Sequence, residues 1–437
     1  MWDLAAGILA CILVAAATES TPEAAARAAN PAAPASAVVG QALAPWSEGY
    51  LDIHHINTGR GNAAFFIFPD GTSMIFDAGA LEDDWGRNVA PLVLGLALPN
   101  PSRRPGEWIA DYIDQFKRPG MAGIDYALIS HFHADHYGRV QFTSPASAHG
   151  NWKLAGITDV AERWPLGTLI DRDYPAYDFP VAQRGTKDKS LSNYFRFADG
   201  LATSGRSKVE RFAVGRDDQI VLKYDPERYP TFSVRNIAAN GAVWTGSGSA
   251  SRNVLDVGQI ADGKGKFNEN PLSLMIRLDY GDFDYVTGGD TTGVHTPDQP
   301  EWFDMESKIA PVVGEVDALS LNHHGNRDAT NADWLRALQP RIIVQQTWTS
   351  DHPGGDVVAR ITSKTLWPGQ RDIFATHIQE PTKIAIGPWL TRNYRSMDGH
   401  VVIRVQPGGG AYDVYILDDR STDRKVKAHF GPYQSRQ

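Results

Sequence analysis

Short runs of apolar residues, separated by turn-forming residues, begin near residue 50 of this chain. The segment 50–56 has the length and composition of a strand, and so do 63–68 and 73–76. Pro, Asp and Gly fill most of 69–72, between the last two runs, which is typical of a tight turn. We therefore predict a β-meander that ends near Asp77.

Two later segments have helical periodicity. In 107–116, apolar residues such as Ile109, Tyr112 and Ile113 recur at intervals of three and four, and 331–338 is a second expected helix. Further apolar runs of strand length lie at 125–130, 272–278, 284–287, 316–321, 340–345, 401–405 and 412–417. Strands mixed with helices, without an internal repeat, indicate a layered α/β or α+β domain.

The chain has 437 residues, which is enough for one large domain with long insertions or for two domains. We place the folded domain at about 45–430. Its middle part, about 150–268, is rich in Asp, Arg, Tyr and Pro and ends in the Gly- and Ser-rich stretch 241–265. We predict that this part is an insertion closed by a flexible loop.

The first 37 residues resemble a targeting segment. Residues 4–17 form an apolar run that is shorter than the ~20 residues needed to cross a bilayer, and an Ala- and Pro-rich stretch follows. We predict a signal peptide with a disordered spacer at 1–37, a periplasmic or secreted protein, and no transmembrane segment in the mature chain. Two alternatives stay open: lipidation at Cys11, and a leader without function after a wrongly assigned start codon.

Charge and cysteine content limit the possible function classes. Acidic residues (51) outnumber basic ones (42), the net charge is −9, and no basic run stands out. Proteins that bind long nucleic acids usually carry a basic stripe, so we expect a small-molecule substrate and no tight binding of nucleic acid. The single cysteine is Cys11, which leaves the folded domain without a disulfide or a thiolate ligand.

Four residues able to bind a metal follow directly after the apolar run 125–130: His131, His133, Asp135 and His136. Imidazole and carboxylate groups suit zinc, and also iron or manganese. His131 and His133 project to the same side of an extended segment, as one ion requires. Asp135 and His136 lie where the chain must turn, so they can reach a neighbouring ion. The sequence therefore predicts a site for two divalent metal ions.

The spacing His-x-His-x-Asp-His after a strand resembles the signature of the metallo-β-lactamase superfamily. Asp77 in an Asp-x-Gly motif, Asp290 after an apolar strand, and the later pair His323 and His324 match further family motifs in the family's order. The resemblance implies a metallo-β-lactamase αββα sandwich with long insertions. It also implies that Asp290 bridges both metals and that Asp77 supports the site without ligating a metal.

Within the superfamily, the pattern is most similar to the hydrolase domain of ComEC-type competence proteins and to related phosphorylcholine esterases. Residues 58–63 resemble their Gly-Gln-Gly-Asp-Ala turn, with Asn62 where Asp is usual, and 269–274 resemble their Glu-Asn-x-x-Ser-Leu segment. His352, before a proline, matches a downstream His-Pro. Asn62 and His352 are therefore candidates for substrate contact or support. The resemblance does not include the ComEC membrane channel, so we do not expect DNA uptake.

A two-metal site of this type needs about six ligating groups. The candidates are His131, His133, Asp135, His136, Asp290 and His324. The family often adds one histidine between the first cluster and the bridging aspartate; His149 lies there, and both a ligand and an exposed loop histidine stay open for it. Of the adjacent pair we choose His324 as the ligand and His323 as the group that stabilises charge or protonates a leaving group. The reverse assignment stays open.

Coordination to a metal lowers the pKa of water from 15.7 to about 7, which makes a nucleophile at neutral pH. We therefore predict a metal-dependent hydrolase that uses a metal-bound hydroxide on a phosphodiester-type substrate, with two divalent ions, zinc first and manganese or iron as alternatives. His323 and Asp135 are its catalytic candidates. Hydrolysis of a lactone, thioester or carboxylic ester is the first alternative, and a non-catalytic or redox metal-binding protein is the second.

Overall fold

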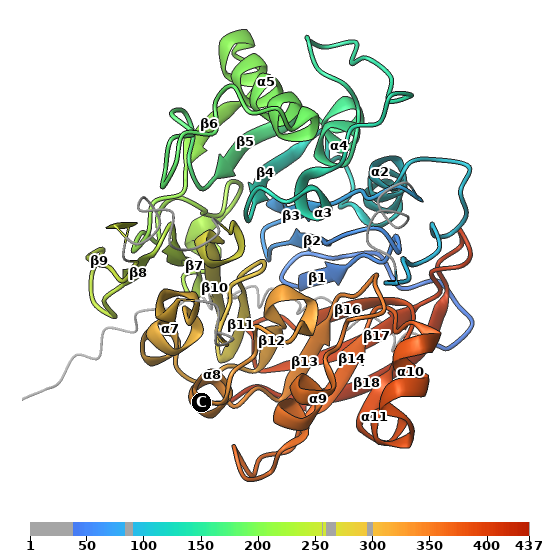
Figure 1. The fold of residues 1–437 in the computed structure, drawn as a ribbon. Coiled ribbons are helices and arrows are strands. Elements are labelled where there is room, and N and C mark those ends of the chain that lie inside the picture. The colour runs from blue at the N-terminus through green and yellow to red at the C-terminus, as the bar shows by residue number, and fades with distance from the viewer. Residues whose placement is uncertain (1–37, 84–90, 256, 259–267, 295–299, 437) are drawn as a thin grey trace, which may run out of the picture. The chain divides into compact units, whose positions relative to one another are not determined.

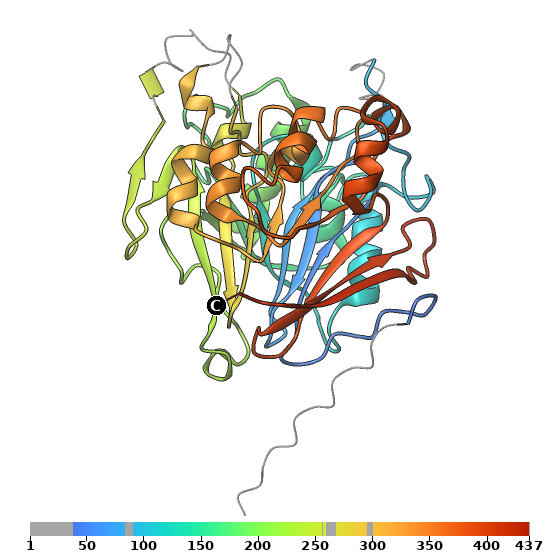
Figure 2. The same cartoon turned by 90° about the horizontal axis from the view of Figure 1, so that it is seen from below.

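Two sheets, each of nine strands, carry the fold (Figures 1 and 2). The structure is a computed structural model, and it describes residues 38–83, 91–255, 257–258, 268–294 and 300–436. The strand order is β18-β17-β16-β1-β2-β3-β4-β5-β6 in the first sheet and β15-β14-β13-β12-β11-β10-β7-β8-β9 in the second. These described residues belong to one compact unit.

The strands of the first sheet are β1 (Leu51–His55), β2 (Ala63–Ile67), β3 (Ser73–Ala78), β4 (Ile124–Ile129), β5 (Leu166–Asp171), β6 (Lys208–Arg211), β16 (His400–Val405), β17 (Ala411–Leu417) and β18 (Val426–Gln434). The strands of the second sheet are β7 (Phe232–Ala239), β8 (Ala242–Trp244), β9 (Ser251–Asn253), β10 (Met275–Tyr280), β11 (Phe283–Thr287), β12 (Ala318–Ser320), β13 (Ile342–Gln345), β14 (Asp372–Ala375) and β15 (Tyr394–Ser396). The α-helices are α2 (Pro105–Phe116), α3 (Ala134–Tyr137), α4 (Ile157–Arg163), α5 (Lys189–Ser204), α7 (Glu306–Val313), α8 (Ala332–Leu338), α9 (Gly355–Thr362), α10 (Glu380–Ile386) and α11 (Pro388–Asn393).

Successive side chains of one strand belong to different hydrophobic cores, which defines four layers. In β2, Phe66 packs between the two sheets, whereas Phe65 packs on the outer face with α2, α4 and α5. In β13, Ile342 faces the same inter-sheet core, whereas Ile343 packs against α7, α8 and α9. Because side chains alternate along a strand, this pattern requires helices outside both sheets. The fold is the predicted αββα sandwich.

The predicted strands agree with the structure where their apolar pattern was clear. The meander at 50–76 is β1, β2 and β3, paired antiparallel in that order. The run 125–130 is β4, and the two C-terminal runs pair as β16 and β17. The predicted helix at 331–338 is α8, with Asn331 as its N-cap, since the Asn331 side chain accepts a hydrogen bond from the Trp334 N–H.

The segment 150–268 differs from the expected insertion, because it supplies strands to both sheets. It adds β5 and β6 to the parallel edge of the first sheet and β7, β8 and β9 to the second. Of the predicted loop 241–265, the described residues include the paired strands β8 and β9, while 256 and 259–265 lie outside the described residues. The apolar side chains of this segment therefore pack into the cores of the domain.

The predicted leader at 1–37 lies outside the described residues, so export stays a prediction. Within the described part of the chain, no helix has the length and apolar character needed to cross a membrane.

Parallel pairing determines where the loops gather. Strands β3 to β6 run parallel, and so do β11 to β15. The carboxyl ends of parallel strands lie at the same edge of a sheet, where loops can carry functional groups. The predicted metal motifs follow the carboxyl ends of β4, β11 and β12.

A buried ion pair joins β1 to β16. Its titration makes the stability of the fold depend on pH. Asp52 lies opposite Arg404, which donates to both of its carboxylate oxygens, at 2.8 and 2.6 Å. Burial alone would raise the pKa of Asp52, but the charge and hydrogen bonds of Arg404, with His54, lower the pKa to about 2. This pKa lies below the ordinary value of 3.8. The ionised Asp52 carboxylate therefore stabilises the folded state fully above about pH 5, and this stabilisation is lost as the pH falls through 2.

We expect Asp52→Asn to lower the free energy of unfolding by about 3–5 kcal/mol at neutral pH, because it leaves Arg404 buried without its counter-charge. The difference between the wild type and this variant should shrink by about 2 kcal/mol between pH 5 and pH 2. Urea unfolding of the metal-free proteins at several pH values measures both effects. Asp333→Asn, which removes an exposed carboxylate on α8, is the control. A difference that stays constant over this pH range would contradict the assignment.

Candidate metal centre

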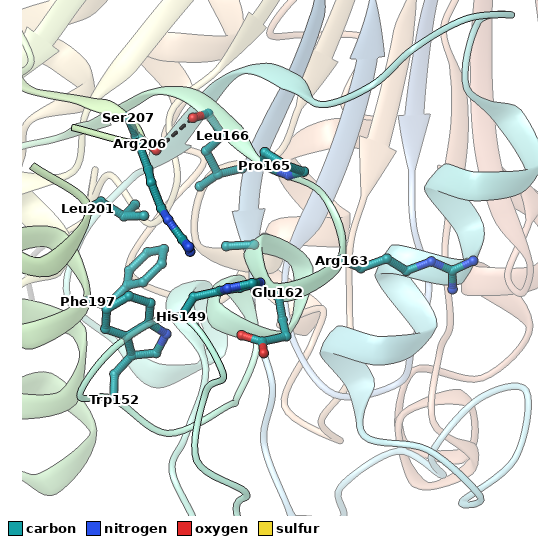
Figure 3. A pocket seen from close by; sticks show the side chains of 11 residues that line it. His149, Trp152, Glu162, Arg163, Pro165, Leu166, Phe197, Leu201, Arg206 and Ser207 are labelled. Carbon is teal, nitrogen blue, oxygen red and sulfur yellow. Dashed lines mark hydrogen bonds between the residues drawn. The ribbon is translucent and has the colours of Figure 1, made fainter. Parts of the chain in front are cut away.

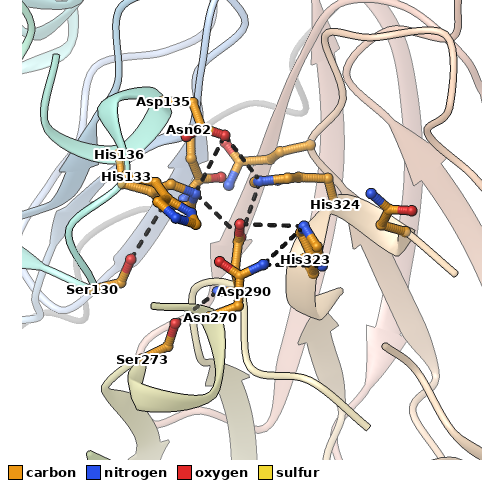
Figure 4. A network of polar contacts seen from close by, with 12 residues as sticks. Asn62, Ser130, His133, Asp135, His136, Asn270, Ser273, Asp290, His323 and His324 are labelled. Atoms are coloured by element: carbon orange, nitrogen blue, oxygen red, sulfur yellow. Dashed lines mark hydrogen bonds and ion pairs between the residues drawn. The ribbon is translucent and has the colours of Figure 1, made fainter. Parts of the chain in front are cut away.

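Three loops at the carboxyl ends of strands carry the predicted ligands. The loop after β4 begins with His131 and continues into α3. The chain leaves β11 through two glycines to Asp290, and β12 is followed by a short 3-10 turn, Asn322–Gly325, that includes His324. Figure 4 shows these side chains converging on Asp290.

Two groups of ligand atoms share the carboxylate of Asp290. One group consists of His131, His133 and Asp290. The other consists of Asp135, His136, Asp290 and His324. In each group the ligand atoms lie within 4.8 Å of one another. The structure therefore brings together all six ligands predicted from the sequence, with Asp290 between two sites.

Distances within the cluster assign one oxygen of Asp290 to each side. Its Oδ1 atom lies 3.1 Å from His136 Nε2 and 3.0 Å from His324 Nε2. Its Oδ2 atom lies 3.6 Å from His131 Nε2. A carboxylate with its two oxygens directed to different ligand groups has the arrangement needed to bridge two cations.

Buried polar atoms without partners show that the residues fit a metal. The Nε2 atoms of His136 and His324 and the Oδ1 atom of Asp290 are buried and have no hydrogen-bond partner among the described residues. The two histidine nitrogens lie at ion-pair distance from Asp290 Oδ1 without forming a hydrogen bond, and buried polar groups without a hydrogen bond cost free energy. A cation coordinated by these three atoms would satisfy all of them. Nitrogen and carboxylate donors suit zinc, manganese and iron.

Asp77 orients the second ligand group. The ring of His136 donates from Nδ1 to Asp77 Oδ2 at 2.7 Å, which leaves its Nε2 atom free to face Asp290. Asp77 also accepts hydrogen bonds from the Ser130 N–H (2.7 Å) and from the Asn62 amide (3.0 Å). Such partners fix the ring orientation and raise the basicity of a ligating histidine. Asp77 thus contacts a ligand and lies in neither ligand group.

The turn at 58–63 supports Asp135 through a backbone hydrogen bond. The Asn62 N–H donates to the Asp135 carbonyl at 2.8 Å. A Cβ atom added at Gly79 would lie 1.7 Å from the same carbonyl oxygen, so only glycine fits there. Asn62 therefore supports both Asp77 and the backbone of α3.

His323 lies beside the ligand groups but in neither of them. Both His323 and His324 adopt left-handed backbone conformations, with φ of 44° and 56°, so the chain bends sharply between strand β12 and Gly325. The bend places His324 in the second group. His323 Nδ1 contacts the carboxylate of Asp328, and its Nε2 lies 3.7 Å from Asp290 Oδ2. The geometry agrees with His324 as the ligand and His323 as a neighbouring pocket residue.

Opposing charges set the protonation of the cluster. Burial raises the pKa of Asp290, but the ring charges of His136 and His324 lower the pKa well below its ordinary value. Burial lowers the pKa of His323, but Asp328 and Asp290 raise it to about 9. The carboxylates are therefore held ionised, the state that ligates cations.

A buried ion pair supports the first ligand loop from behind. Arg172 donates to both carboxylate oxygens of Glu269, at 2.6 and 2.8 Å, and neither side chain is exposed by more than 6%. Glu269 accepts a hydrogen bond from the backbone N–H of Phe132, between the two ligands His131 and His133. The guanidinium of Arg172 also lies over the Phe132 ring, 4.4 Å from its centroid. The pair thus fixes the loop that carries the first ligand group.

The metal cluster faces a pocket of about 330 Å³. His352 lines it and is buried, and its ring packs 5.0 Å from that of His324. Trp348 and Asn270 also line the pocket, and the Asn270 amide lies 3.2 Å from His323 Nε2. His352 therefore stays a candidate for substrate contact.

The structure does not bring His149 to the cluster. Its side chain is exposed and lines a different cavity, with Trp152 and Arg206 (Figure 3). Of the two interpretations left open for His149, the structure agrees with the exposed loop. The loop 138–156 leaves α3 and returns beside it, because Gly138 packs against Ala155 and Gly156. His149 lies at the far part of that loop.

Sequence reasoning missed Asp328, Arg172 and Trp348. Each lies outside any motif, and each acts through a contact made only in the folded chain. Asp328, five residues after His323, is the nearest to a detectable signal, since an acidic residue in the same loop is a frequent partner of histidine.

We expect the purified protein to bind about two divalent metal ions per chain, because two ligand groups share one carboxylate. Asp290→Ala should lose at least one metal, and His149→Ala should keep both. Elemental analysis after reconstitution with zinc, manganese or iron gives the stoichiometry, and circular dichroism checks the fold of each variant. An Asp290→Ala variant that keeps two metals would contradict the bridging role, and metal loss in His149→Ala would restore His149 as a ligand.

Comparisons with known proteins give weak structural likenesses only. No family model matches the chain, and no curated protein matches it. One similar solved structure is CmlA, a diiron β-hydroxylase from Streptomyces venezuelae, with a TM-score of 0.36, 12% identity, and coverage of 83% of this chain and 55% of CmlA. The chain thus spans about half the length of CmlA. Another is the short form of human tRNase Z, with a TM-score of 0.29, 10% identity, and coverage of 67% of this chain and 91% of tRNase Z.

The assignment of the metal centre rests on the layers of the fold and on the geometry of the two ligand groups. The αββα sandwich and the histidine–aspartate cluster at its strand ends agree with the predicted resemblance to the metallo-β-lactamase superfamily, while the narrower resemblance to ComEC-type hydrolases stays a prediction from sequence motifs.

Proposed function

We propose that this chain is a two-metal hydrolase and that its substrate is a phosphodiester. The observation that carries the proposal is the pair of ligand groups that share Asp290 at the pocket. Two divalent ions bound there would lower the pKa of water to about 7 and polarise a phosphoryl oxygen. Zinc is the first choice, and manganese or iron would suit the same donors.

The ligand set favours this class over β-lactam hydrolysis. The best-known β-lactamases of this fold use a cysteine in the second site, and this chain has only Cys11, far before the motifs. Here Asp290 and Asp135 occupy the second group with His136 and His324. A bridging carboxylate resembles the phosphodiesterase, nuclease, lactonase and thioesterase branches of the superfamily, of which we propose the phosphodiesterase first.

His323 is the proposed general acid that protonates the leaving group. In the proposal the Nδ1–H of His323 donates a hydrogen bond to the carboxylate of Asp328, which stabilises the ring in its protonated form. Its Nε2 atom faces Asp290 and the pocket, and the Nε2 proton passes to the leaving oxygen. An alkoxide, the leaving group of an unactivated phosphodiester, is a poor one and gains most from such an acid. Asn270 and His352 line the space left for the substrate.

Substrate class is tested by a panel of chromogenic substrates with the metal-loaded protein. The panel contains a phosphodiester, a phosphomonoester, a lactone, a thioester and a cephalosporin, each with added zinc or manganese. We expect the phosphodiester to have the highest kcat/KM and Asp290→Ala to abolish its turnover. A higher kcat/KM for the lactone or thioester would overturn the proposed substrate class but would agree with a hydrolase. Bound metal without turnover of any substrate would overturn the hydrolase proposal.

We expect substitutions of the two adjacent histidines to affect metal binding and catalysis differently. His324→Ala should lower the metal content, because it removes a ligand. His323→Ala should keep both metals and lower kcat by about 10²-fold or more on an unactivated diester. The loss should be smaller on a p-nitrophenyl diester, whose leaving group needs no proton.

Metal analysis and kinetics with both substrates distinguish these roles. His323→Gln is the matched variant, since it keeps a polar side chain but cannot act as an acid. Metal loss in His323→Ala together with an intact site in His324→Ala would exchange the two roles. An equal loss of kcat on both diesters would contradict the acid role.

A further inference from the structure

A second cavity, of about 340 Å³, lies between α4, α5 and the starts of β5 and β6 (Figure 3). Its lining residues, as the structure describes them, are distinct from those of the metal pocket. The metal ligands follow the carboxyl end of β4, whereas Leu166 begins the parallel strand β5 and Ser207 precedes β6. The cavity therefore lies at the opposite end of the sheet, about 20 Å away for strands of this length.

The cavity has apolar walls from three elements. Phe197 and Leu201 come from α5, Ala161 from α4 and Leu166 from β5, and Trp152 comes from the preceding loop. The Trp152 ring packs edge-on against Phe197, with the centroids 5.5 Å apart. A cavity of this volume with apolar walls is typical of a site for a small molecule.

Three unpaired donor groups lie around these apolar walls. Arg206 extends toward His149 and the ring of Phe197 in Figure 3. Its guanidinium has no ion-pair or hydrogen-bond partner in the described part of the chain, and neither has the ring of His149 or the indole N–H of Trp152. The cavity thus combines an apolar interior with a free cation and further donors.

The other two charged residues of the lining are already engaged. Arg163 forms an ion pair with Asp114, at 2.5 Å, and points away from the cavity in Figure 3. Glu162 accepts hydrogen bonds from the Ser147 hydroxyl (2.6 Å) and the Ala148 N–H (2.9 Å), and so fixes the loop that carries His149. Arg206, whose side chain is exposed, is therefore the charge available to a ligand, and it favours an anion.

We propose that this cavity binds a small aromatic or branched aliphatic carboxylic acid. The carboxylate pairs with the guanidinium of Arg206, whose planar fork can hold both oxygens. The apolar body of the acid fills the space between Trp152, Phe197 and Leu201. The negative charge of Glu162 in the same lining disfavours a dianion such as a phosphate monoester.

Titration calorimetry of the metal-loaded protein with 3-phenylpropanoate and 4-methylpentanoate tests the site. Both acids should bind in a saturable manner with one site per chain, while 3-phenylpropanol, with the same ring but no charge, should bind at least ten-fold more weakly. Arg206→Gln should weaken the binding of both acids by about ten-fold or more, because a hydrogen bond to a charged group is lost. Arg196→Gln is the matched control, since Arg196 is an exposed arginine of α5, the helix that supplies Phe197 and Leu201, and does not line the cavity.

The metal centre serves as the second control. Asp290→Ala should bind both acids with unchanged affinity, because the two sites lie at opposite ends of the sheet. Failure of both acids to bind, equal binding of the alcohol, or unchanged binding in Arg206→Gln would overturn the proposal. Loss of acid binding in Asp290→Ala would place the ligand at the metal centre instead.

Discussion

Two groups of histidine and aspartate ligands share one carboxylate, that of Asp290. The rest of the site depends on this constraint. In the two groups, four histidines and Asp135 have ligand atoms within a few ångströms of Asp290, and most of these side chains are buried. Polar atoms packed this closely compete for the same few protons, and three of them have no hydrogen-bond partner among the described residues. Bound cations satisfy these atoms and compensate the carboxylates together.

Holding these side chains in place requires unusual backbone at the strand ends. Asp77, His323 and His324 have positive φ angles, which cost free energy in residues other than glycine. Gly79 allows the backbone of Asp135 to approach more closely than a side chain would permit. The sheets tolerate this strain because their cores are buried on both faces, as Phe65 and Phe66 of β2 show. Rigid strands therefore position irregular loops at one edge of the sandwich.

The sequence predicted the parts of the molecule that depend on local pattern. Strands such as β2 and β4 have continuous apolar runs, and the ligands of the first loop follow one another within six positions. The strand β6 could not be found in this way, because the sequence Lys-Val-Glu-Arg at the sheet edge has little apolar signal. Arg172 could not be found either, since its role depends on Glu269, ninety-seven positions later. His149 illustrates the reverse case, in which a suitable residue type at a suitable sequence position lies in a loop directed elsewhere.

Strand β5 connects the segment 150–268 to both the second cavity and the loop that carries the first metal ligands. At its amino end Leu166 lines the second cavity, and immediately after its carboxyl end Arg172 pairs with Glu269. Asp171, the last residue of the strand, accepts hydrogen bonds from the hydroxyls of Tyr177 and Tyr194, so the loop after β5 is tied to α5, which also forms a cavity wall. A segment of this kind cannot vary freely as a surface insertion would, because a shift of β5 would displace Glu269 from the Phe132 backbone. The ligand loop thus depends on the segment 150–268 for its geometry, even though none of the residues that the structure describes there lies in either ligand group.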